Sequence, residues 1–347
     1  MNYAHFIKEL GRGREGACNL SVADAQQLYG AMLDGGVPEL ELGAIAIALR
    51  VKGETFDEMI GFMSASNDRL HSLQIPAGRF RPVVIPSYNG ARKGVNLTPL
   101  LAMLLRRYSI PVLIHGLIEG YGRVTTAQVF REFGLIPCAS QSQAQQSLDE
   151  SGLAYVPLSV ISPGLNTQLA LRSRLGLRNS AHSLVKMLDP FKGQGLLLAA
   201  ATHPDYLDSM REVLGALGAH ALLLRGTEGE PFANPRRRPR IEYLHDGVAD
   251  TLFEAEHDSL KALPQLPESC DARTTADWMR RVLAGEITLP APIANQLACC
   301  LYGSGYAEDF NQAKAIVAVE GSGQHPAWSA RKIPGVQSGI SSISHPV

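Results

Sequence analysis

Cysteines, aromatic residues and long apolar runs are scarce in this sequence, and each scarcity excludes a class of protein. The five cysteines form no CxxC pair and no spacing typical of a zinc finger. An odd number of scattered cysteines is typical of reduced thiols, which excludes a disulfide scaffold. No apolar run approaches the ~18 residues that a membrane-spanning helix needs, and the first residues lack the apolar core of a secretory leader. We therefore expect a cytoplasmic protein that does not contact membranes.

Net charge is also almost absent, because 32 basic residues balance 33 acidic ones. With 347 residues, of which 45% are apolar, the composition is that of a globular protein of about two domains. The balance hides a local basic cluster in which four of five consecutive residues are arginine: Arg236, Arg237, Arg238 and Arg240. Such a cluster can contact several phosphates, and the alternative is a solvated loop without a partner.

The order of apolar patterns predicts an α/β protein with an all-α N-terminal domain. Residues 1–76 carry only helical patterns, including helices that begin after Ser21 and at Thr55. From residue 81, short β-branched runs alternate with helical segments, which predicts a mostly parallel sheet covered by helices. We expect a helical domain at 1–76, completed by 163–187, an α/β domain at 77–162 and 188–320, and an extended or flexible tail at 321–347.

The segment from Val83 to Thr98 predicts an anion site. A β-branched run enters a turn-rich basic segment with two glycines, and a helical pattern follows. Backbone N–H groups of such a loop, and the helix N-terminus after it, bind phosphate or sulfate. Ordinary turn and cap chemistry is the equally open alternative. The candidate residues are Ser87, Asn89, Gly90, Gly94, Asn96 and Thr98.

Four strings, in the same order along the chain, resemble the anthranilate phosphoribosyltransferase family, which shares its fold with class II nucleoside phosphorylases. They are Ala46–Thr55 (AIALRVKGET), Asn96–Thr98 (NLT), Arg172–Asn179 (RSRLGLRN) and the helix that opens at His203-Pro204-Asp205. The resemblance implies the fold. It also implies, as an alternative function, a transferase that uses phosphoribosyl pyrophosphate, magnesium and an anthranilate-like aromatic acceptor. Arg172 matches the family arginine that meets the acceptor carboxylate, and Arg123, Thr125 and Thr126 resemble a family stretch of donors. N-capping is the alternative role of Thr125.

The departures from the family pattern predict a degenerate active site. The family's GTGGD loop reads Ser87-Tyr88-Asn89-Gly90-Ala91 here, and its KHGNR string keeps only His115 and Gly116. His115 is either a pocket residue or an interior histidine. The acidic pair that carries magnesium in the family is missing from its expected place, where Glu228 or Glu230 are the possible substitutes. Phosphoryl and diphosphate chemistry depends on such charges. We therefore expect no catalytic residue and no cofactor, with magnesium only if the transferase alternative holds.

The same departures resemble the YbiB subgroup of this family. That resemblance implies a homodimer formed through the helical domain and binding of DNA or RNA without sequence specificity. The leading hypothesis is therefore a nucleic-acid-binding protein that contacts the phosphate backbone through the arginine cluster. Further basic candidates are Arg92, Lys93, Arg106 and Arg107, for which surface charge at helix ends is the alternative.

Overall fold

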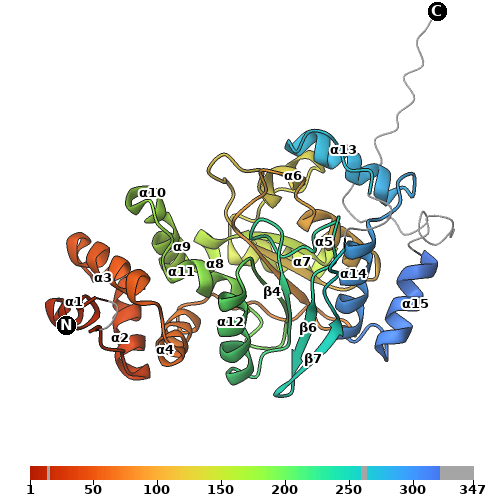
Figure 1. Ribbon diagram of the computed structural model, residues 1–347. Helices are drawn as coiled ribbons and strands as arrows, with labels where there is room; N and C mark the ends of the chain where they lie inside the picture. The colour runs from red at the N-terminus through yellow and green to blue at the C-terminus, as the bar shows by residue number, and fades with distance from the viewer. Residues whose placement is uncertain (14–15, 259–263, 321–347) are drawn as a thin grey trace, which may run out of the picture.

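The computed structural model describes residues 1–13, 16–258 and 264–320, and the predicted tail at 321–347 lies outside these ranges. The chain forms two lobes (Figure 1). One lobe is all helical and contains the N-terminal residues, and in the larger lobe helices surround a central sheet. The predicted class, α/β with an all-α N-terminal domain, is confirmed.

Four N-terminal helices build most of the helical lobe: α1 (Tyr3–Leu10), α2 (Val22–Leu33), α3 (Glu39–Lys52) and α4 (Phe56–Asn67). Side chains cap two of them as the sequence predicts. The Ser21 hydroxyl accepts a hydrogen bond from the N–H of Asp24 at 3.1 Å, and Thr55 forms a capping box with Glu58. Helices α2 and α4 pack through stacked rings of Tyr29 and Phe62, whose centroids lie 4.6 Å apart.

A later segment packs against these helices. It contains α8 (Leu158–Ile161), α9 (Pro163–Ala170), α10 (Arg172–Leu175), α11 (Ala181–Leu184) and the 3-10 turn Val185–Met187. The Gln168 side chain donates a hydrogen bond to the carbonyl of Met32 at 2.8 Å, which ties α9 to the end of α2. At Gly164, a Cβ atom would lie 2.4 Å from the Leu33 carbonyl oxygen, so the two helices meet at backbone contact.

The sheet has seven strands in the order β3-β2-β1-β4-β5-β6-β7. The first five strands run parallel, and β6 and β7 form an antiparallel hairpin at one edge. The strands are β1 (Val83–Ser87), β2 (Val112–Gly116), β3 (Leu153–Pro157), β4 (Leu196–Ala201), β5 (Ala221–Arg225), β6 (Ile241–His245) and β7 (Val248–Phe253). Because the parallel strands share one direction, the loops after β1, β2, β4 and β5 gather at one edge of the sheet, where α/β proteins usually bind ligands.

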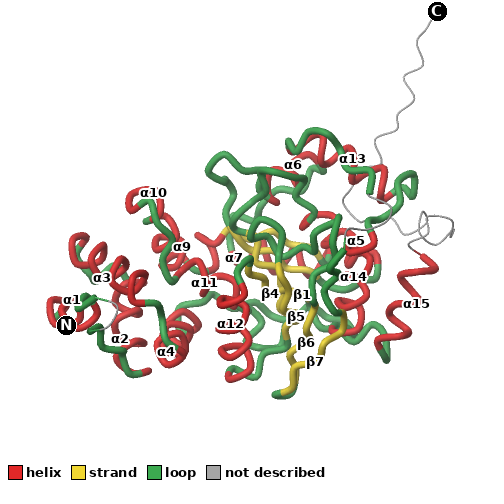
Figure 2. The backbone as a smooth tube through the Cα atoms, in the orientation of Figure 1, coloured by secondary structure: helices red, strands yellow, loops and turns green. Residues whose placement is uncertain are grey.

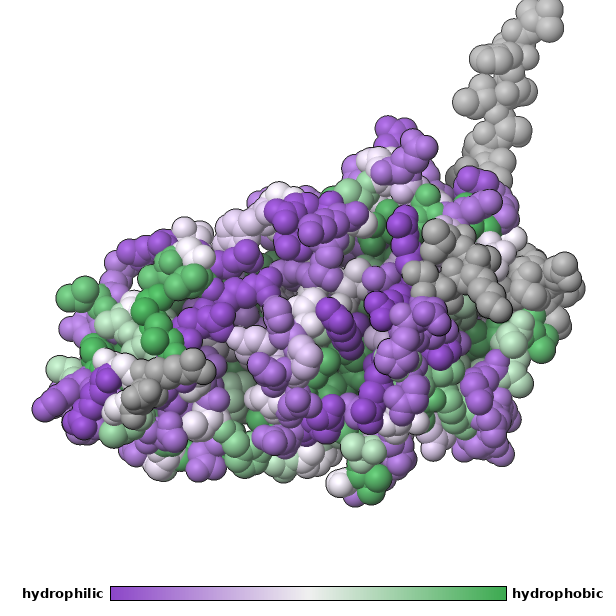
Figure 3. All heavy atoms as spheres, in the orientation of Figure 1, coloured by the Kyte–Doolittle hydropathy of each residue, from purple (hydrophilic) through white to green (hydrophobic). Residues whose placement is uncertain are grey.

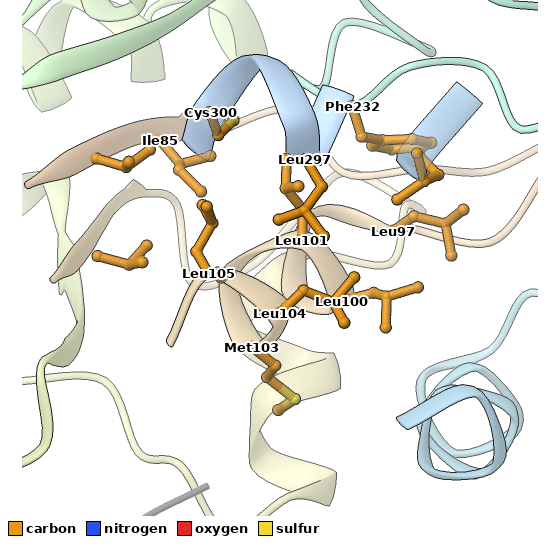
Figure 4. Packing of buried hydrophobic residues seen from close by; sticks show 14 of the residues in the cluster. Ile85, Leu97, Leu100, Leu101, Met103, Leu104, Leu105, Phe232, Leu297 and Cys300 are labelled. Atoms are coloured by element: carbon orange, nitrogen blue, oxygen red, sulfur yellow. The ribbon is translucent and has the colours of Figure 1, made fainter. Parts of the chain in front are cut away.

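Both faces of the parallel strands are buried. Val83 and Ile85 contribute to one apolar core and Val84 to the other, as the alternation of side chains along a strand requires. Figure 2 shows the strands enclosed by helices on both sides. In one core, α5 (Thr98–Arg107) packs its leucines against Leu297 and Cys300 of α14 (Ala291–Gly303), as Figure 4 shows.

The remaining helices cover the sheet and its edges: α6 (Thr126–Glu132), α7 (Gln141–Ser151), α12 (Pro204–Ala216), α13 (Ala272–Leu283) and α15 (Phe310–Glu320). Of these five helices, α7 was not expected from the sequence. Its only buried residues are Ala144 and Leu148, so it lacks the apolar stripe that predicts a helix.

Candidate anion site and arginine cavity

Two loops meet at the carboxyl edge of the sheet. The first, Ser87–Gly94, follows β1 and is called the glycine loop below. The second, Gly226–Glu230, follows β5 and is called the carboxylate turn. The turn is tight, because Thr227 and Glu230 form a bridge and Glu228 adopts a left-handed backbone with φ of 55°. At Gly226 a Cβ atom would lie 2.3 Å from the Glu230 carbonyl oxygen, so this position requires glycine.

Glu230 of the carboxylate turn is fully buried in the glycine loop. Its Oε1 atom accepts hydrogen bonds from the backbone N–H groups of Asn89 and Gly90, at 2.8 and 2.7 Å. Its Oε2 atom accepts from the hydroxyls of Ser87 and Thr98. Burial raises the pKa of Glu230, and the hydrogen bonds from Ser87, Gly90 and Asn89 oppose that shift. All four acceptor positions of this carboxylate are therefore used.

Glu228 occupies the other half of the glycine loop. Its Oε1 atom accepts from the N–H groups of Lys93 and Gly94, at 2.7 and 3.1 Å, and its Oε2 atom accepts from the N–H of Arg92 at 3.0 Å. The guanidinium of Arg123 lies 3.4 Å from Oε2. Three consecutive backbone N–H groups that converge on one anion form a nest, which is a phosphate-binding arrangement in other proteins. Here the anion is a side chain of the same protein.

Hydroxyl and amide groups predicted for the pocket brace this arrangement from inside. The Ser87 and Thr126 hydroxyls lie 2.7 Å apart, and the Asn96 amide donates to the Thr126 hydroxyl at 3.2 Å. The Asn96 side-chain oxygen accepts from the N–H of Thr98 at 3.1 Å. Thr125 caps α6 in a capping box with Gln128, as its alternative role predicted.

The predicted anion loop therefore exists, but carboxylates of the same chain bind its donors. Asn89, Gly90 and Gly94 donate to Glu228 or Glu230, and so do the Ser87 and Thr98 side chains. The two glutamates do not fit magnesium in this arrangement, because N–H and O–H donors occupy their oxygens. Within the described ranges, no group of three or more His, Cys, Asp or Glu side chains could hold a metal ion.

The region that matches the family's acceptor site is nearly closed. Tyr88, Tyr121, Arg123 and Arg172, with His182, line a cavity of only about 10 Å³. The Arg172 guanidinium lies 5.9 Å from the centroid of the Tyr121 ring, and the Tyr88 hydroxyl donates to the carbonyl of His182 at 3.1 Å. Tyr121 and Arg178 were not among the predicted residues, although Arg178 lies in the family-like string Arg172–Asn179.

Positive charge exceeds negative charge around the two glutamates. Burial lowers the pKa of Arg123, Glu228 opposes that shift, and nearby Arg92, Arg178 and Arg172 lower the pKa further. Burial, with a further contribution from Arg178, lowers the pKa of His182 to about 3. Arg178 also donates to the side-chain oxygen of Asn89 at 2.7 Å. Four guanidinium groups, those of Arg92, Arg123, Arg172 and Arg178, therefore lie near the two carboxylates.

Four residues predicted for the pocket or for nucleic-acid contact have other roles. His115 is fully buried in β2, and burial lowers its pKa to about 4, so it is an interior neutral histidine rather than a pocket residue. Arg106 and Arg107 lie at the far end of α5 from the glycine loop, where their guanidinium groups donate to the carbonyls of Ser151 and Leu283. Burial lowers the pKa of Arg107 to about 10. We therefore withdraw both arginines as nucleic-acid contacts. Gly116 ends β2 opposite Ser87, where it serves strand pairing.

A larger cavity of about 800 Å³ lies beside the carboxylate turn and is called the arginine cavity below. Its basic lining residues are Lys93, Arg211, Arg225, Arg236, Arg237, Arg238 and Arg240, and its acidic ones are Glu228, Glu242 and Glu256. The four clustered arginines of the sequence therefore line one cavity. Arg92 lies outside its lining but beside Arg123.

Some of these cations are engaged within the chain and others are not. Arg240 pairs with Glu242 at 2.9 Å, Arg238 pairs with Glu256 at 3.4 Å, and Arg237 donates to the Glu256 carbonyl. In the part of the chain that the structure describes, no carboxylate pairs with the side chains of Lys93, Arg225 or Arg236. All three are exposed, so their charges remain available to a ligand.

The helical lobe and the sheet topology, with a loop-bound anion site at the carboxyl edge, define a class: the fold of anthranilate phosphoribosyltransferases. Residues 4–69 match the model of the glycosyl transferase family helical bundle domain. The structure of anthranilate phosphoribosyltransferase from Thermus thermophilus aligns over 97% of this chain and 99% of that chain, with a TM-score of 0.74 and 21% identity. The enzyme from Saccharomyces cerevisiae, in complex with phosphoribosyl pyrophosphate and magnesium, aligns over 96% of both chains, with a TM-score of 0.72 and 13% identity.

Sequence comparison identifies the family. The uncharacterized protein YbiB of Escherichia coli is 43% identical over 318 residues, which cover 91% of this chain and 99% of that protein. Anthranilate phosphoribosyltransferase of Leifsonia xyli is 27% identical over 279 residues, which cover 77% of this chain and 76% of the enzyme. The chain belongs to the anthranilate phosphoribosyltransferase-like family that includes YbiB. No helix within the described ranges is long and apolar enough to cross a membrane.

Proposed function

We propose that this protein binds DNA or RNA through the phosphate backbone, without sequence specificity, in the arginine cavity. The observation that carries the proposal is the charge of the lining. Seven lysine and arginine side chains face three glutamates in one cavity of about 800 Å³. Arginine is well suited to phosphate because its planar guanidinium donates several hydrogen bonds in a fixed geometry.

The lining also supports the lack of specificity. Sequence is read by contacts to base edges, and in single strands aromatic rings hold the bases by stacking so that those edges can be read. Phe232 is the one Phe, Tyr or Trp residue in the described lining, and its ring is fully buried in the core. The exposed aromatic ring in that lining is the imidazole of His257. A cavity with seven cations and one exposed imidazole favours contacts to phosphates over contacts to bases.

The transferase alternative is not favoured by the geometry. A diphosphate would need the N–H groups of Asn89 and Gly90, in the string that replaces the family's GTGGD loop, and those groups bind the fully buried Glu230. An aromatic acceptor would need far more room than the ~10 Å³ beside Arg172, which holds about one water molecule. Titration with phosphoribosyl pyrophosphate and magnesium tests this alternative. Micromolar binding would revive it, and no binding at millimolar concentration would end it.

The main experiment measures affinity for a labelled oligonucleotide as a function of salt. We expect the logarithm of the binding constant to fall linearly with the logarithm of salt concentration, and to vary little among sequences. The double variant R225E/R236E should bind all sequences more weakly by at least tenfold. Its control, R281E/K314E, changes the net charge equally on the exposed surfaces of α13 and α15.

Two outcomes would overturn the proposal. Binding that does not depend on salt would exclude phosphate contacts as its source. An equal loss of affinity in R225E/R236E and R281E/K314E would show that overall charge, and not the arginine cavity, attracts the nucleic acid.

We also propose that the protein forms a homodimer through the helical lobe. Leu40, Ala44, Ile47 and Val51 recur at helical spacing along α3, so they share one face, and the side chains of Leu40 and Val51 are 82% and 60% exposed. Figure 3 shows hydrophobic surface gathered over this lobe. Light scattering should give twice the mass of one chain for the wild type, and about one chain for L40E/V51E. A monomeric wild type at micromolar concentration would contradict this proposal.

A further inference from the structure

We propose that the nest formed by the N–H groups of Arg92, Lys93 and Gly94 is a phosphate subsite of the arginine cavity, and that Glu228 is the built-in anion which an incoming phosphate displaces. The inference rests on the proposed function for the source of the phosphate, a nucleic-acid backbone. The site itself follows from the geometry of the glycine loop and the carboxylate turn.

The two glutamates of the turn differ in how replaceable they are. Glu230 is fully buried and holds two hydroxyls as well as two N–H groups, so it is part of the core. Glu228 has a side chain that is 15% exposed and lies in the lining of the arginine cavity. Lys93 and Gly94, whose N–H groups bind Glu228, line the same cavity. A ligand in the cavity can therefore reach the nest.

The donors suit a phosphate at least as well as a carboxylate. Glu228 presents two oxygens to four donors, which are three backbone N–H groups and the Arg123 guanidinium. A phosphodiester also presents two non-bridging oxygens with one negative charge, and a terminal phosphate presents three. Both can satisfy the same nest.

The surroundings favour exchange. Arg92, Arg172 and Arg178 all lie close enough to Arg123 to act on its charge, so a single carboxylate does not neutralise the site. The backbone of Glu228 is in a left-handed conformation, with φ of 55°, that residues other than glycine rarely adopt.

The experiment compares pyrophosphate binding to the wild type, E228A and E256A by calorimetry. Glu256 lines the same cavity and pairs with Arg238 at 3.4 Å, so E256A removes the same charge without emptying the nest. We expect E228A to bind pyrophosphate at least tenfold more tightly than either the wild type or E256A. Equal affinities of E228A and E256A would overturn the inference, because the gain would then come from charge alone.

A second measurement uses the unaltered chain and so does not depend on how E228A folds. In an amide NMR spectrum of the wild type, a short oligonucleotide should shift the signals of Arg92, Lys93 and Gly94. The absence of these shifts at saturation would also overturn the inference.

These results separate the inference from the proposed function. Nucleic-acid binding that falls with salt, combined with no gain of pyrophosphate affinity in E228A, leaves the proposed function standing and removes the inference. Pyrophosphate binding by E228A in a protein that binds no nucleic acid does the reverse.

Discussion

Gly116 lies so close to Ser87 in the neighbouring strand that a Cβ atom on the glycine would be 1.7 Å from the Ser87 carbonyl oxygen. Any side chain there must push β1 and β2 apart, at the point where the glycine loop begins. We expect G116A to lower the free energy of unfolding by about 3 kcal/mol or more, as overpacking against a rigid backbone does. Urea denaturation measures the loss.

A matched control for this substitution is G215A. Gly215 lies in α12 with open space around its Cβ position, so alanine there should stabilise the helix by about 0.5–1 kcal/mol. A G116A protein as stable as the wild type would show that the two strands separate at little cost.

The loss of stability on substitution of Glu230 should depend on whether the new side chain can still bind the N–H and O–H groups that donate to the carboxylate. E230A leaves the N–H groups of Asn89 and Gly90 buried without an acceptor, and we expect it to cost about 3–5 kcal/mol. E230Q should cost about 1–2 kcal/mol, because its amide oxygen can accept from the N–H groups while the Ser87 and Thr98 hydroxyls turn to accept from its NH₂ group. Equal losses in the two variants would contradict this account. Thermal and urea denaturation report both values.

Lys52, in the family-like string Lys52-Gly53-Glu54-Thr55, forms a buried ion pair with Glu58 in the helical lobe. Lys52 Nζ lies 2.7 Å from Glu58 Oε2, with side-chain exposures of 5% and 0%, and Glu58 also accepts from the N–H groups of Leu20 and Thr55. We expect E58A to destabilise the protein by about 3–5 kcal/mol, because it leaves a buried lysine unpaired.

The pair of Glu39 and Arg174 is the control, since both side chains are more than half exposed. E39A should cost less than about 1 kcal/mol, as surface pairs usually do. If E58A and E39A had similar effects on the urea midpoint, the buried pair would contribute no more than a surface pair.

His245 on the β6–β7 hairpin should give a small pH-dependent contribution to stability. Its hydrogen bond with Asp250, and then that with Asp246, raise its pKa above the usual 6.5. Its protonated form is therefore favoured by folding, so the contribution is complete below pH 6.5 and disappears as the pH rises through the raised value. We expect D250N to lower the melting temperature below pH 6.5 and to match the wild type at pH 9. The effect should stay below about 1 kcal/mol because the pair is near the surface. A difference that is the same at both pH values would exclude His245 as its cause.

Local sequence patterns predicted most of the fold, because its strands and helices are specified by near neighbours. The parallel strands are buried β-branched or leucine-rich runs, and Ser21 and Thr55 are caps that a sequence shows directly. Helix α7 was not predicted, because most of its surface is polar and it lacks an apolar stripe. The positions of Arg106 and Arg107 could not be predicted either, since their partners Ser151 and Leu283 are distant in the chain.

The candidate site shows the same division. The glycine loop as an anion site could be predicted, because the order of strand, glycine turn and helix is local. The carboxylate that fills this loop could not be predicted. Glu230 lies 141 residues from Asn89 in the sequence, and only the sheet order brings the two residues together. The nucleic-acid and dimer hypotheses remain proposals to be tested.

Because Glu228 is tethered to the site that it fills, it competes with free anions at an effective concentration, not at a bulk one. For short tethers that concentration is on the order of millimolar or higher, and dilution of the protein does not reduce it. A small phosphorylated metabolite must outcompete the tethered carboxylate with the nest alone. A polyanion that also binds Arg225 and Arg236 can offset the competition through its additional contacts. The carboxylate turn would then select ligands that carry several phosphates over ligands that carry only one.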